Sequence, residues 1–504
     1  MRVTLFLLLF SGLWSIDVRA NPRLSRGIQL LQEGKVEEAL PLLQRSVAEH
    51  PGSEKAHNYY GLALAKMSAL QVAIAEFRKA LDINPNYPEA QYNLATALTR
   101  IGDLQGAILA FRAALRKRPG MVQAYIELGL VYAHTGDKAQ ALAQFRAAVA
   151  ADPNSAEGHN HLGNALRQDG DLESAIAEFR RAVSIDASSV SALRNLAQAL
   201  RDQHNWESAI EYHRRLVSLQ PTSGESHADL GYVLKRADKL SEAVDALRKA
   251  VVLSPELARA HFYLAEAVAQ SGDSATALPE YEKARRLDPK DAEFSLKFGL
   301  ALSKSRPQEA IIELRRSAEL DPKNPATHRS LGTLLRRTGD LQGASSEFEM
   351  ARELSQEADR HSDAIVHTKT AIQYLKKNDP SRAIGELRLA LTAEPDSADA
   401  NHLLGVALGS AGKWREANQA FEVALRKKPS DPEIRFNFGV FLGRRADWQG
   451  AVRELRYVVA LRPGHAQAHC LLASALARMG DAEGAQTELK LARELGQCES
   501  ESPR

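Results

Sequence analysis

Two histidines stand two residues apart in the segment "EGHNHLGNAL", which runs from Glu157 to Leu166. A His-x-His pair is a plausible source of zinc or copper ligands, because neutral imidazole nitrogens bind both ions. The segment "GHAQAHC" offers a second candidate group in His465, His469 and Cys470, since residues four apart share one face of a helix. Either group makes a metal site only if its donors converge, so the elements that carry them must be considered first.

Cys470 and Cys498 are the two cysteines of the chain. Both fall in the last structural unit predicted below, at opposite ends of an antiparallel helix pair. A disulfide between them would close a loop of about 28 residues and contribute roughly 3.5 kcal/mol in the chain-entropy model, in a compartment that permits oxidation. Two free thiols are the alternative, and the sequence does not decide between them.

Catalytic motifs are missing from the sequence. It has no Gly-x-Ser-x-Gly, Walker loop, His-Glu-x-x-His, Cys-x-x-Cys or Gly-x-Gly-x-x-Gly motif. The formal net charge of +2 gives no reason to expect bulk binding to nucleic acid or anionic membranes. Basic runs at Arg116 and Arg426 fall at predicted helix ends, where cations complement the helix dipole. We therefore expect that the protein is not an enzyme, binds no cofactor and has no nucleic-acid partner.

The first twenty residues have the pattern of a secretion signal. Arg2 precedes an apolar run from Val3 to Ile16, and Val18-Arg19-Ala20 fits a signal-peptidase site. We expect cleavage after Ala20 and a mature chain that is periplasmic or extracellular, with no membrane insertion. An uncleaved anchor is the alternative, but the run is short compared with the about 20 residues that a membrane-spanning helix needs.

The rest of the chain repeats with a period of 34 residues. Prolines mark the period at Pro51, Pro85, Pro119, Pro153, Pro221, Pro255, Pro289, Pro322, Pro395, Pro429 and Pro463. Ala187 stands where a proline would fall between Pro153 and Pro221, one spacing is 33, and the series breaks before Pro395. Leu-Gly or Leu-Ala recurs at one place in each period, and a later Ala, aromatic, Ala series follows, as at Ala107, Phe111 and Ala114. Each period predicts two amphipathic helices, A and B, which must stack on neighbouring units to bury their apolar faces.

This pattern resembles the tetratricopeptide repeat (TPR) family, whose unit is about 34 residues long. In that frame fourteen units begin at residues 20, 54, 88, 122, 156, 190, 224, 258, 292, 325, 364, 398, 432 and 466. The resemblance implies an all-α, right-handed solenoid of helix-turn-helix repeats. It also implies a non-catalytic scaffold whose partners are proteins or extended peptides.

The repeat frame changes the interpretation of the histidines. His159 occupies position 4 of its unit, and so do His57, His227, His261, His328, His367 and His469. A packing residue recurs once per unit, whereas a metal site needs its ligands once. His161 is at position 6, which faces the concave side, so the rings of His159 and His161 should diverge. We predict no metal site at either histidine group.

In this family the concave wall is formed by positions 2, 5, 6, 9, 12 and 13 of helix A. Carried over, these positions give a candidate groove of Tyr92, Asn93, Glu127, Asn160, His161, Asn164, Arg167, Arg194, Asn195, Gln198, Arg201, Asp229, Tyr232, Lys235, Phe262 and Tyr263. Amide and guanidinium groups can bond a peptide backbone, and aromatic rings can hold side chains. A solvated polar face without a ligand is the alternative. The family's carboxylate clamp is matched by Asn164 and Asn195 but not by Asn160, where a Lys belongs, which disfavours a cytosolic chaperone adaptor.

Polar residues at normally apolar positions indicate where the stack ends. Gln486 and Arg493 replace apolar residues in the last unit, and Ser345 and Arg352 do so in the unit from 325. We predict a signal peptide at 1–20, ten repeats at 21–357, a spacer or joint at 358–363, four repeats at 364–498 and a tail at 499–504. One continuous array with a weak joint is the alternative.

Two classes of function remain open from the sequence. The first is an exported scaffold or adaptor that binds peptide segments of an envelope, secretion or polysaccharide-export assembly. The second is a substrate-recognition subunit, because the array resembles the repeat region of O-linked N-acetylglucosamine transferases. That function would need a catalytic partner in trans.

Overall fold

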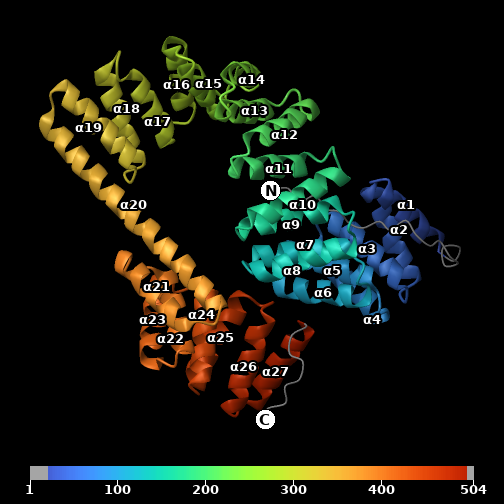
Figure 1. The fold of residues 1–504 in the computed structure, drawn as a ribbon. Coiled ribbons are helices and arrows are strands. Elements are labelled where there is room, and N and C mark those ends of the chain that lie inside the picture. Colours follow the sequence, from blue (N-terminus) through green and yellow to red (C-terminus); the bar gives the residue numbers. More distant parts are fainter. Residues whose placement is uncertain (1–20, 496–504) are drawn as a thin grey trace. The chain divides into compact units, whose positions relative to one another are not determined.

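The computed structural model describes residues 21–495. The predicted signal peptide, Cys498 and the predicted tail therefore lie outside the described residues. Within 21–495 the chain forms 27 α-helices and no strand, which confirms the predicted all-α class. The helices follow one another as antiparallel pairs, as Figure 1 shows.

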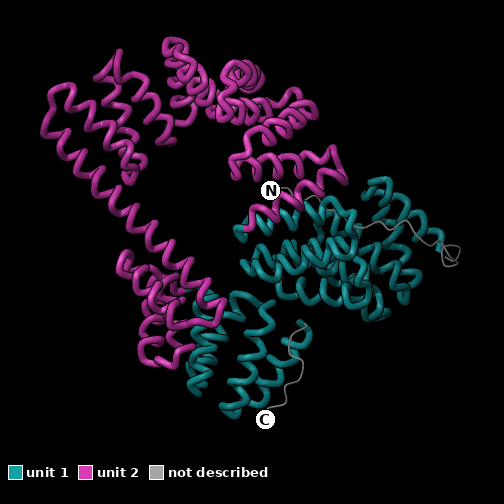
Figure 2. The backbone as a smooth tube through the Cα atoms, viewed as in Figure 1, with its two compact units in different colours: residues 1–170, 430–504 teal, residues 171–429 magenta. Residues whose placement is uncertain are grey.

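The described helices belong to two compact units (Figure 2). Unit 1 comprises residues 21–170 and 430–495, and unit 2 comprises residues 171–429. Unit 1 contains α1 (Pro22–Gln32), α2 (Val36–Glu49), α3 (Glu54–Lys66), α4 (Leu70–Ile83), α5 (Pro88–Ile101), α6 (Leu104–Lys117), α7 (Val122–His134), α8 (Lys138–Ala151), α9 (Ala156–Gln168), α24 (Pro432–Arg444), α25 (Trp448–Leu461), α26 (Ala466–Arg478) and α27 (Ala482–Glu494). Unit 2 contains α10 (Leu172–Ile185), α11 (Val190–Asp202), α12 (Trp206–Leu219), α13 (Gly224–Arg236), α14 (Leu240–Leu253), α15 (Ala258–Gln270), α16 (Ser274–Leu287), α17 (Ala292–Leu302), α18 (Pro307–Leu320), α19 (Pro325–Thr338), α20 (Leu341–Lys376), α21 (Pro380–Ala393), α22 (Ala398–Ser410) and α23 (Trp414–Lys427).

The turn between helices A and B depends on one residue with positive φ and one capping carboxylate. Gly102 ends α5 with φ 85°, a left-handed conformation that costs glycine little. The Asp103 carboxylate then accepts the Gly106 N–H at 2.9 Å and caps α6. Pro307 and Pro380 begin α18 and α21, at first-turn positions where a missing N–H costs little.

Close contact of helices A and B explains the recurring Leu-Gly pair. The Phe421 ring lies so close to Gly405 that a Cβ on this glycine would come within 2.8 Å of it. In the same way, a Cβ on Gly129 would come within 2.6 Å of the Phe145 ring. The aromatic residue of helix B therefore fills the space left by a missing side chain on helix A, which is the interdigitation that dense packing requires.

The segment in which the repeat period is interrupted is part of one long helix, α20. Helix α20 runs for 36 residues, contacts both α19 and α21, and contains the predicted spacer at 358–363 (Figure 1). No proline or glycine interrupts the chain between Gly343 and Pro380, so helix B of one repeat continues into helix A of the next. Residues 356–363 are all exposed. This merger explains why fourteen repeats give 27 helices.

The residues predicted to cap the stacks are mostly exposed. Gln486 and Arg493 of α27 are exposed, as are Ser345 and Arg352 of α20. Polar side chains at these positions leave no apolar surface for another repeat, which is what a terminal repeat requires. The division into two arrays of ten and four repeats stays a prediction, because the two compact units divide the chain elsewhere.

Unit 1 joins two segments that are far apart in the sequence. The Arg116 guanidinium donates a hydrogen bond to the Glu494 carbonyl at 3.1 Å. Gly464 lies against Tyr132 and Ile108, where an added Cβ would come within 2.7 Å of the Tyr132 ring. The loop before α26 is therefore packed on α6 and α7.

Candidate peptide-binding surfaces

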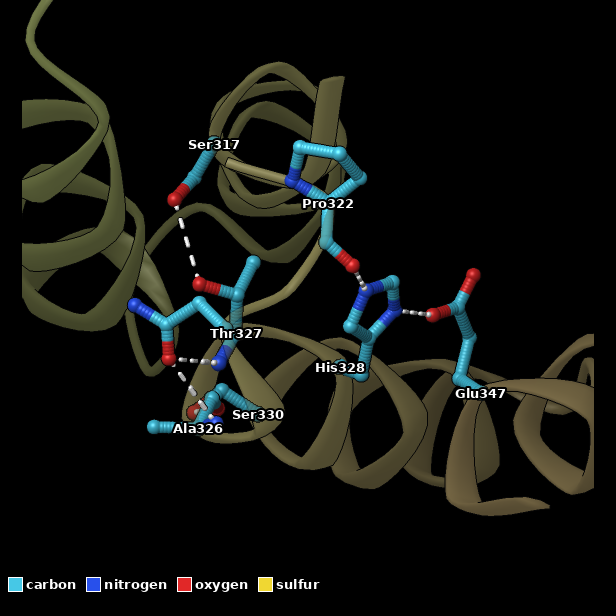
Figure 3. A network of polar contacts seen from close by, with 8 residues as sticks. Ser317, Pro322, Ala326, Thr327, His328, Ser330 and Glu347 are labelled. Carbon is cyan, nitrogen blue, oxygen red and sulfur yellow. Dashed lines mark hydrogen bonds and ion pairs between the residues drawn. The ribbon is translucent and has the colours of Figure 1, made fainter. Parts of the chain in front are cut away.

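The position-4 histidines form hydrogen bonds as well as packing contacts. Figure 3 shows the His328 ring between two acceptors: Nε2 donates to the Pro322 carbonyl at 3.0 Å, and Nδ1 lies 2.6 Å from the Glu347 carboxylate. Because a carbonyl and a carboxylate are both acceptors, the ring can bond both only if it is doubly protonated or if Glu347 carries the proton. The contact links helix A to helix B and to the preceding loop.

The same arrangement recurs in several repeats. His57, His261 and His469 each bond the carbonyl of a proline six residues earlier and the carboxylate of a glutamate nineteen residues later. His367 bonds Glu386 in the same way. The sequence contains the signal for these pairs, since a glutamate follows six of the seven position-4 histidines at this spacing. Sequence reasoning identified the histidines but missed their partners.

The histidine pair that suggested a metal site has unrelated contacts. His159 Nε2 is 3.1 Å from the Pro153 carbonyl, whereas His161 stacks on the Phe145 ring at 5.6 Å between centroids. Among the described residues no group of three metal-ligating side chains comes together. His465 caps α26 by accepting the Ala468 N–H, and Cys470 is disulfide-bonded. Cys498, the partner that the sequence offered as one of two possibilities, lies outside the described residues.

Three residues predicted to line the groove are buried and must be removed from it. Tyr92 is 1% exposed and packs edge-on against Phe111, and Phe262 is 3% exposed and stacks on Phe294. Asn93 is 6% exposed and donates to the Asn58 side chain at 3.0 Å. Burial of the two aromatic rings removes more apolar surface from water than a position in the groove would.

In unit 1 the other predicted residues form a small helix-A face on α7 and α9. Glu127, Asn160, His161, Asn164 and Arg167 are all partly exposed. Burial raises the pKa of the Glu127 carboxyl, although a hydrogen bond from Gln123 opposes the shift. Burial lowers the pKa of His161, so its stacked ring is favoured in the neutral form. His161 and Asn164 also line a shallow hollow with Leu130 and Phe145.

In unit 2 a longer helix-A face extends over α11, α13 and α15. It consists of Arg194, Asn195, Gln198, Arg201, Asp229, Tyr232, Lys235 and Tyr263, none of them buried. The Tyr232 and Tyr263 rings are 4.9 Å apart, and the Lys235 Nζ lies 5.7 Å and 5.8 Å from their centroids. The Arg201 guanidinium is 5.5 Å from the Tyr232 centroid. Cation–π contacts of this kind hold the two rings in place.

Ion pairs fix the charged side chains next to these rings. Lys235 pairs with Glu266, and Glu266 also pairs with Lys297 at 3.1 Å. Burial opposes ionisation of Glu266, yet the hydrogen bond and charge of Lys235, with Lys297, hold its pKa below the ordinary value. Arg259 lies 3.8 Å from Asp229, whose pKa burial raises. Lys297 and Arg259 were not predicted, although they occupy positions 6 and 2 of their units.

One buried residue under this face has no hydrogen-bond partner. His213 of α12 is 3% exposed, and neither ring nitrogen is bonded. Burial, followed by the charges of Arg201 and Arg194, lowers its pKa from 6.5 to about 4. Between these values the unfolded chain binds a proton that the folded chain excludes, so stability falls as the pH drops from about 6.5 to about 4.

We expect the substitution His213→Phe to stabilise the protein, and more so in acid. His213 corresponds to Phe111 in an earlier repeat, and the helix-A residue Ala197 of this repeat corresponds to Ala95 of that one. Because both repeats have alanine at that helix-A position, a phenylalanine ring should fit in place of His213. The gain at pH 4.5 should exceed that at pH 8 by up to about 3 kcal/mol, because the variant has no proton to exclude. Urea denaturation at both pH values measures the gain in the free energy of unfolding. The control is His134→Phe, because His134 is exposed. A gain that does not depend on pH would contradict the expected titration.

Comparison with known families agrees with this architecture. A tetratricopeptide repeat model matches residues 24–88, 92–156, 126–190, 160–226, 228–292 and 368–432, and a second tetratricopeptide repeat model matches residues 466–490. These matches cover more than half of the chain, so the chain belongs to the tetratricopeptide repeat family. The repeats make it a protein-interaction scaffold of a generally non-catalytic family whose members typically bind proteins or peptides.

Several solved structures are similar to this chain at low sequence identity and low TM-score. MamA from Desulfovibrio magneticus RS-1 is 23% identical over 33% of this chain and 94% of that chain, with a TM-score of 0.31. YrrB, described as a TPR protein with an unusual peptide-binding site, is 20% identical over 37% of this chain and 96% of that chain, with a TM-score of 0.31. The APC/C hetero-tetramer Cut9–Hcn1 is 15% identical over 89% of this chain and 95% of that chain, with a TM-score of 0.34. This likeness concerns the fold alone. No match was found among curated proteins. In the described part of the chain, no helix has the length and apolar character needed to cross a membrane.

Proposed function

We propose that this protein is an exported, non-catalytic scaffold that binds extended peptide segments on its helix-A faces. The observation that carries the proposal is the pair of Tyr232 and Tyr263, partly exposed on the A helices of successive repeats, α13 and α15, and held by Lys235 and Arg201. Rings that are already fixed lose little conformational entropy on binding, and tyrosine offers both an apolar face and a hydroxyl. Such a surface suits a peptide side chain.

The polar residues of the same face supply backbone contacts. Gln198 of α11 is partly exposed and can donate to and accept from a peptide group. It lies one turn from Arg201, whose guanidinium contacts the Tyr232 ring. Donors, acceptors and aromatic rings therefore succeed one another along α11, α13 and α15. This arrangement favours an extended ligand over a compact one.

Export is proposed from the sequence of residues 1–20, which lie outside the described residues. The described fold is compatible with cleavage after Ala20, because Asn21 caps α1 by accepting the Leu24 N–H and bonds Ser46 of α2 at 2.7 Å. Cleavage there leaves the first repeat whole. N-terminal sequencing of the exported protein should begin at Asn21, and a chain that retains Met1 would contradict the proposal.

Peptide binding can be tested with the paired tyrosines. We expect a displayed library of random peptides to yield ligands for the purified protein. The double change Tyr232→Ala and Tyr263→Ala should weaken their binding by about 10- to 100-fold, as loss of aromatic hot spots does. Tyr212→Ala on helix B is the matched control, because Tyr212 is partly exposed and also contacts an arginine. An equal loss in the control, or a library without ligands, would overturn the proposal.

The alternative of a substrate-recognition subunit for a glycosyltransferase stays a prediction from the sequence. It requires a catalytic partner, so the two functions differ in what co-purifies with the native protein. A glycosyltransferase bound to the same helix-A face would favour the alternative.

A further inference from the structure

Two arginines stand on the same side of α11. Arg194 and Arg201 are seven residues apart, which corresponds to two turns of helix and a separation of about 10 Å along its axis. Gln198 lies between them on that side. Arg194 is exposed, and Arg201 and Gln198 are partly exposed. The three side chains therefore form one strip of hydrogen-bond donors, which we call the α11 strip.

Lys235, Arg259 and Lys297 of the unit 2 face lie in ion pairs, whereas the arginines of the α11 strip do not. Lys235 pairs with Glu266, and Arg259 lies 3.8 Å from both Glu225 and Asp229. Among the described residues, neither Arg194 nor Arg201 has a carboxylate within ion-pair distance. Burial raises the pKa of Asp229, and the charges of Arg259, Arg201 and Arg194 oppose that shift. The strip therefore presents two guanidinium groups that no ion pair of the described residues holds.

The positive charges of Arg194 and Arg201 also act on the buried side chain of His213. Both ring nitrogens of His213 are unbonded although the residue is 3% exposed. After burial, the charges of Arg201 and Arg194 are the causes that lower its pKa, and no carboxylate opposes them. An unpartnered polar residue under two unpaired arginines is costly in the free protein. An anion bound to the strip would offset that positive charge.

We propose that the α11 strip binds an acidic peptide segment with two carboxylates, one for Arg194 and one for Arg201. The inference rests on the proposed function, and it names the chemistry of the ligand. A chain extended as a polyproline II helix has three residues per turn and rises about 3.1 Å per residue, so acidic side chains three residues apart lie on one side about 9 Å apart, close to the spacing of about 10 Å between the arginines. Guanidinium groups bind carboxylates with two parallel hydrogen bonds, and Gln198 can bond the peptide group between them.

The neighbouring residues set the direction of the segment. Arg201 contacts the Tyr232 ring, and Tyr263 follows at 4.9 Å from Tyr232. A peptide whose second acidic residue reaches Arg201 thus continues onto the two rings. The expected ligand is an acidic segment followed by an apolar or aromatic side chain, with Arg194 at its acidic end.

The test selects peptides from one random library with two forms of the protein. With wild type, the selected peptides should be enriched in Asp or Glu pairs three residues apart, and with R194Q/R201Q this enrichment should vanish. A selected peptide and its twin with Gln for Glu should differ in affinity for wild type by about 10- to 100-fold and bind R194Q/R201Q equally. R180Q is the control, since Arg180 is an exposed arginine of helix B in the same unit.

The outcomes separate this inference from the function on which it depends. Selected peptides without acidic enrichment, or twins that bind wild type equally, would overturn the acidic ligand and leave peptide binding intact. A library without any ligand would overturn both. Single-stranded DNA that binds wild type more tightly than the acidic peptide, and loses affinity in R194Q/R201Q, would also overturn the proposal by assigning the strip to nucleic acid. Circular dichroism of R194Q/R201Q should match wild type, because neither arginine is buried.

Discussion

Replacing Phe421 by alanine is expected to destabilise the repeat formed by α22 and α23 by about 3–5 kcal/mol. Phe421 is 1% exposed, and its ring fills the space over Gly405. The facing residue Gly405 has no side chain to fill the space, so the substitution leaves a cavity. In a repeat protein each unit depends on its neighbours, and the loss should spread to the adjacent helix α21.

Hydrogen exchange of the α22 and α23 amides measures this loss directly, together with the urea midpoint of the whole protein. Leu389→Ala on α21 is the matched control, because Leu389 is 50% exposed. It should change the free energy of unfolding by less than about 0.5 kcal/mol, the usual range for surface positions. Similar effects of the two substitutions would show that Phe421 does not lie in the core of its repeat.

Glu76→Ala is expected to lower stability by about 1–3 kcal/mol, because it leaves the buried Nδ1 of His57 without its partner. The side chains of His57 and Glu76 are 5% and 8% exposed, so water cannot replace the carboxylate easily. The ring keeps its other bond to the Pro51 carbonyl at 3.0 Å. Urea denaturation of the variant gives the cost.

The chain supplies a reciprocal control in the repeat of His227. This histidine bonds the Pro221 carbonyl, but Ala246 stands nineteen residues later where other repeats have Glu. Ala246→Glu should therefore be tolerated, since the new carboxylate faces a histidine that is ready to bond it. If Glu76→Ala costs nothing, or if Ala246→Glu is as harmful as a buried unpaired charge, the His–Glu pairs have no structural role.

The repeat period predicted most of the fold. Because each repeat is built from local helices and contacts its neighbours, the spacing of small residues, aromatic residues and prolines determines which faces pack. The continuous helix α20 was not predicted, although the lack of a helix breaker before Pro380 is visible in the sequence.

The candidate binding surface was predicted less completely. Repeat position indicates which side of helix A a residue occupies, but the chemistry of the side chain decides whether it is buried. Tyr92 and Phe262 share position 5 with Arg194, yet the two apolar rings are buried and the arginine is exposed. The pairing of Lys235 with Glu266 joins neighbouring repeats. Such pairs depend on distances between helices, which one repeat pattern does not contain.

The measurement that tests the account most directly is photo-cross-linking of a selected peptide. A peptide with a photoreactive residue next to its acidic pair, bound to the full chain, should cross-link to α11, α13 and α15, and mass spectrometry should locate the adducts near Tyr232 and Tyr263. Excess unlabelled peptide should abolish them. Adducts on the helix-B surfaces of α12, α14 and α16 would contradict the central claim that helix-A side chains form the binding surface.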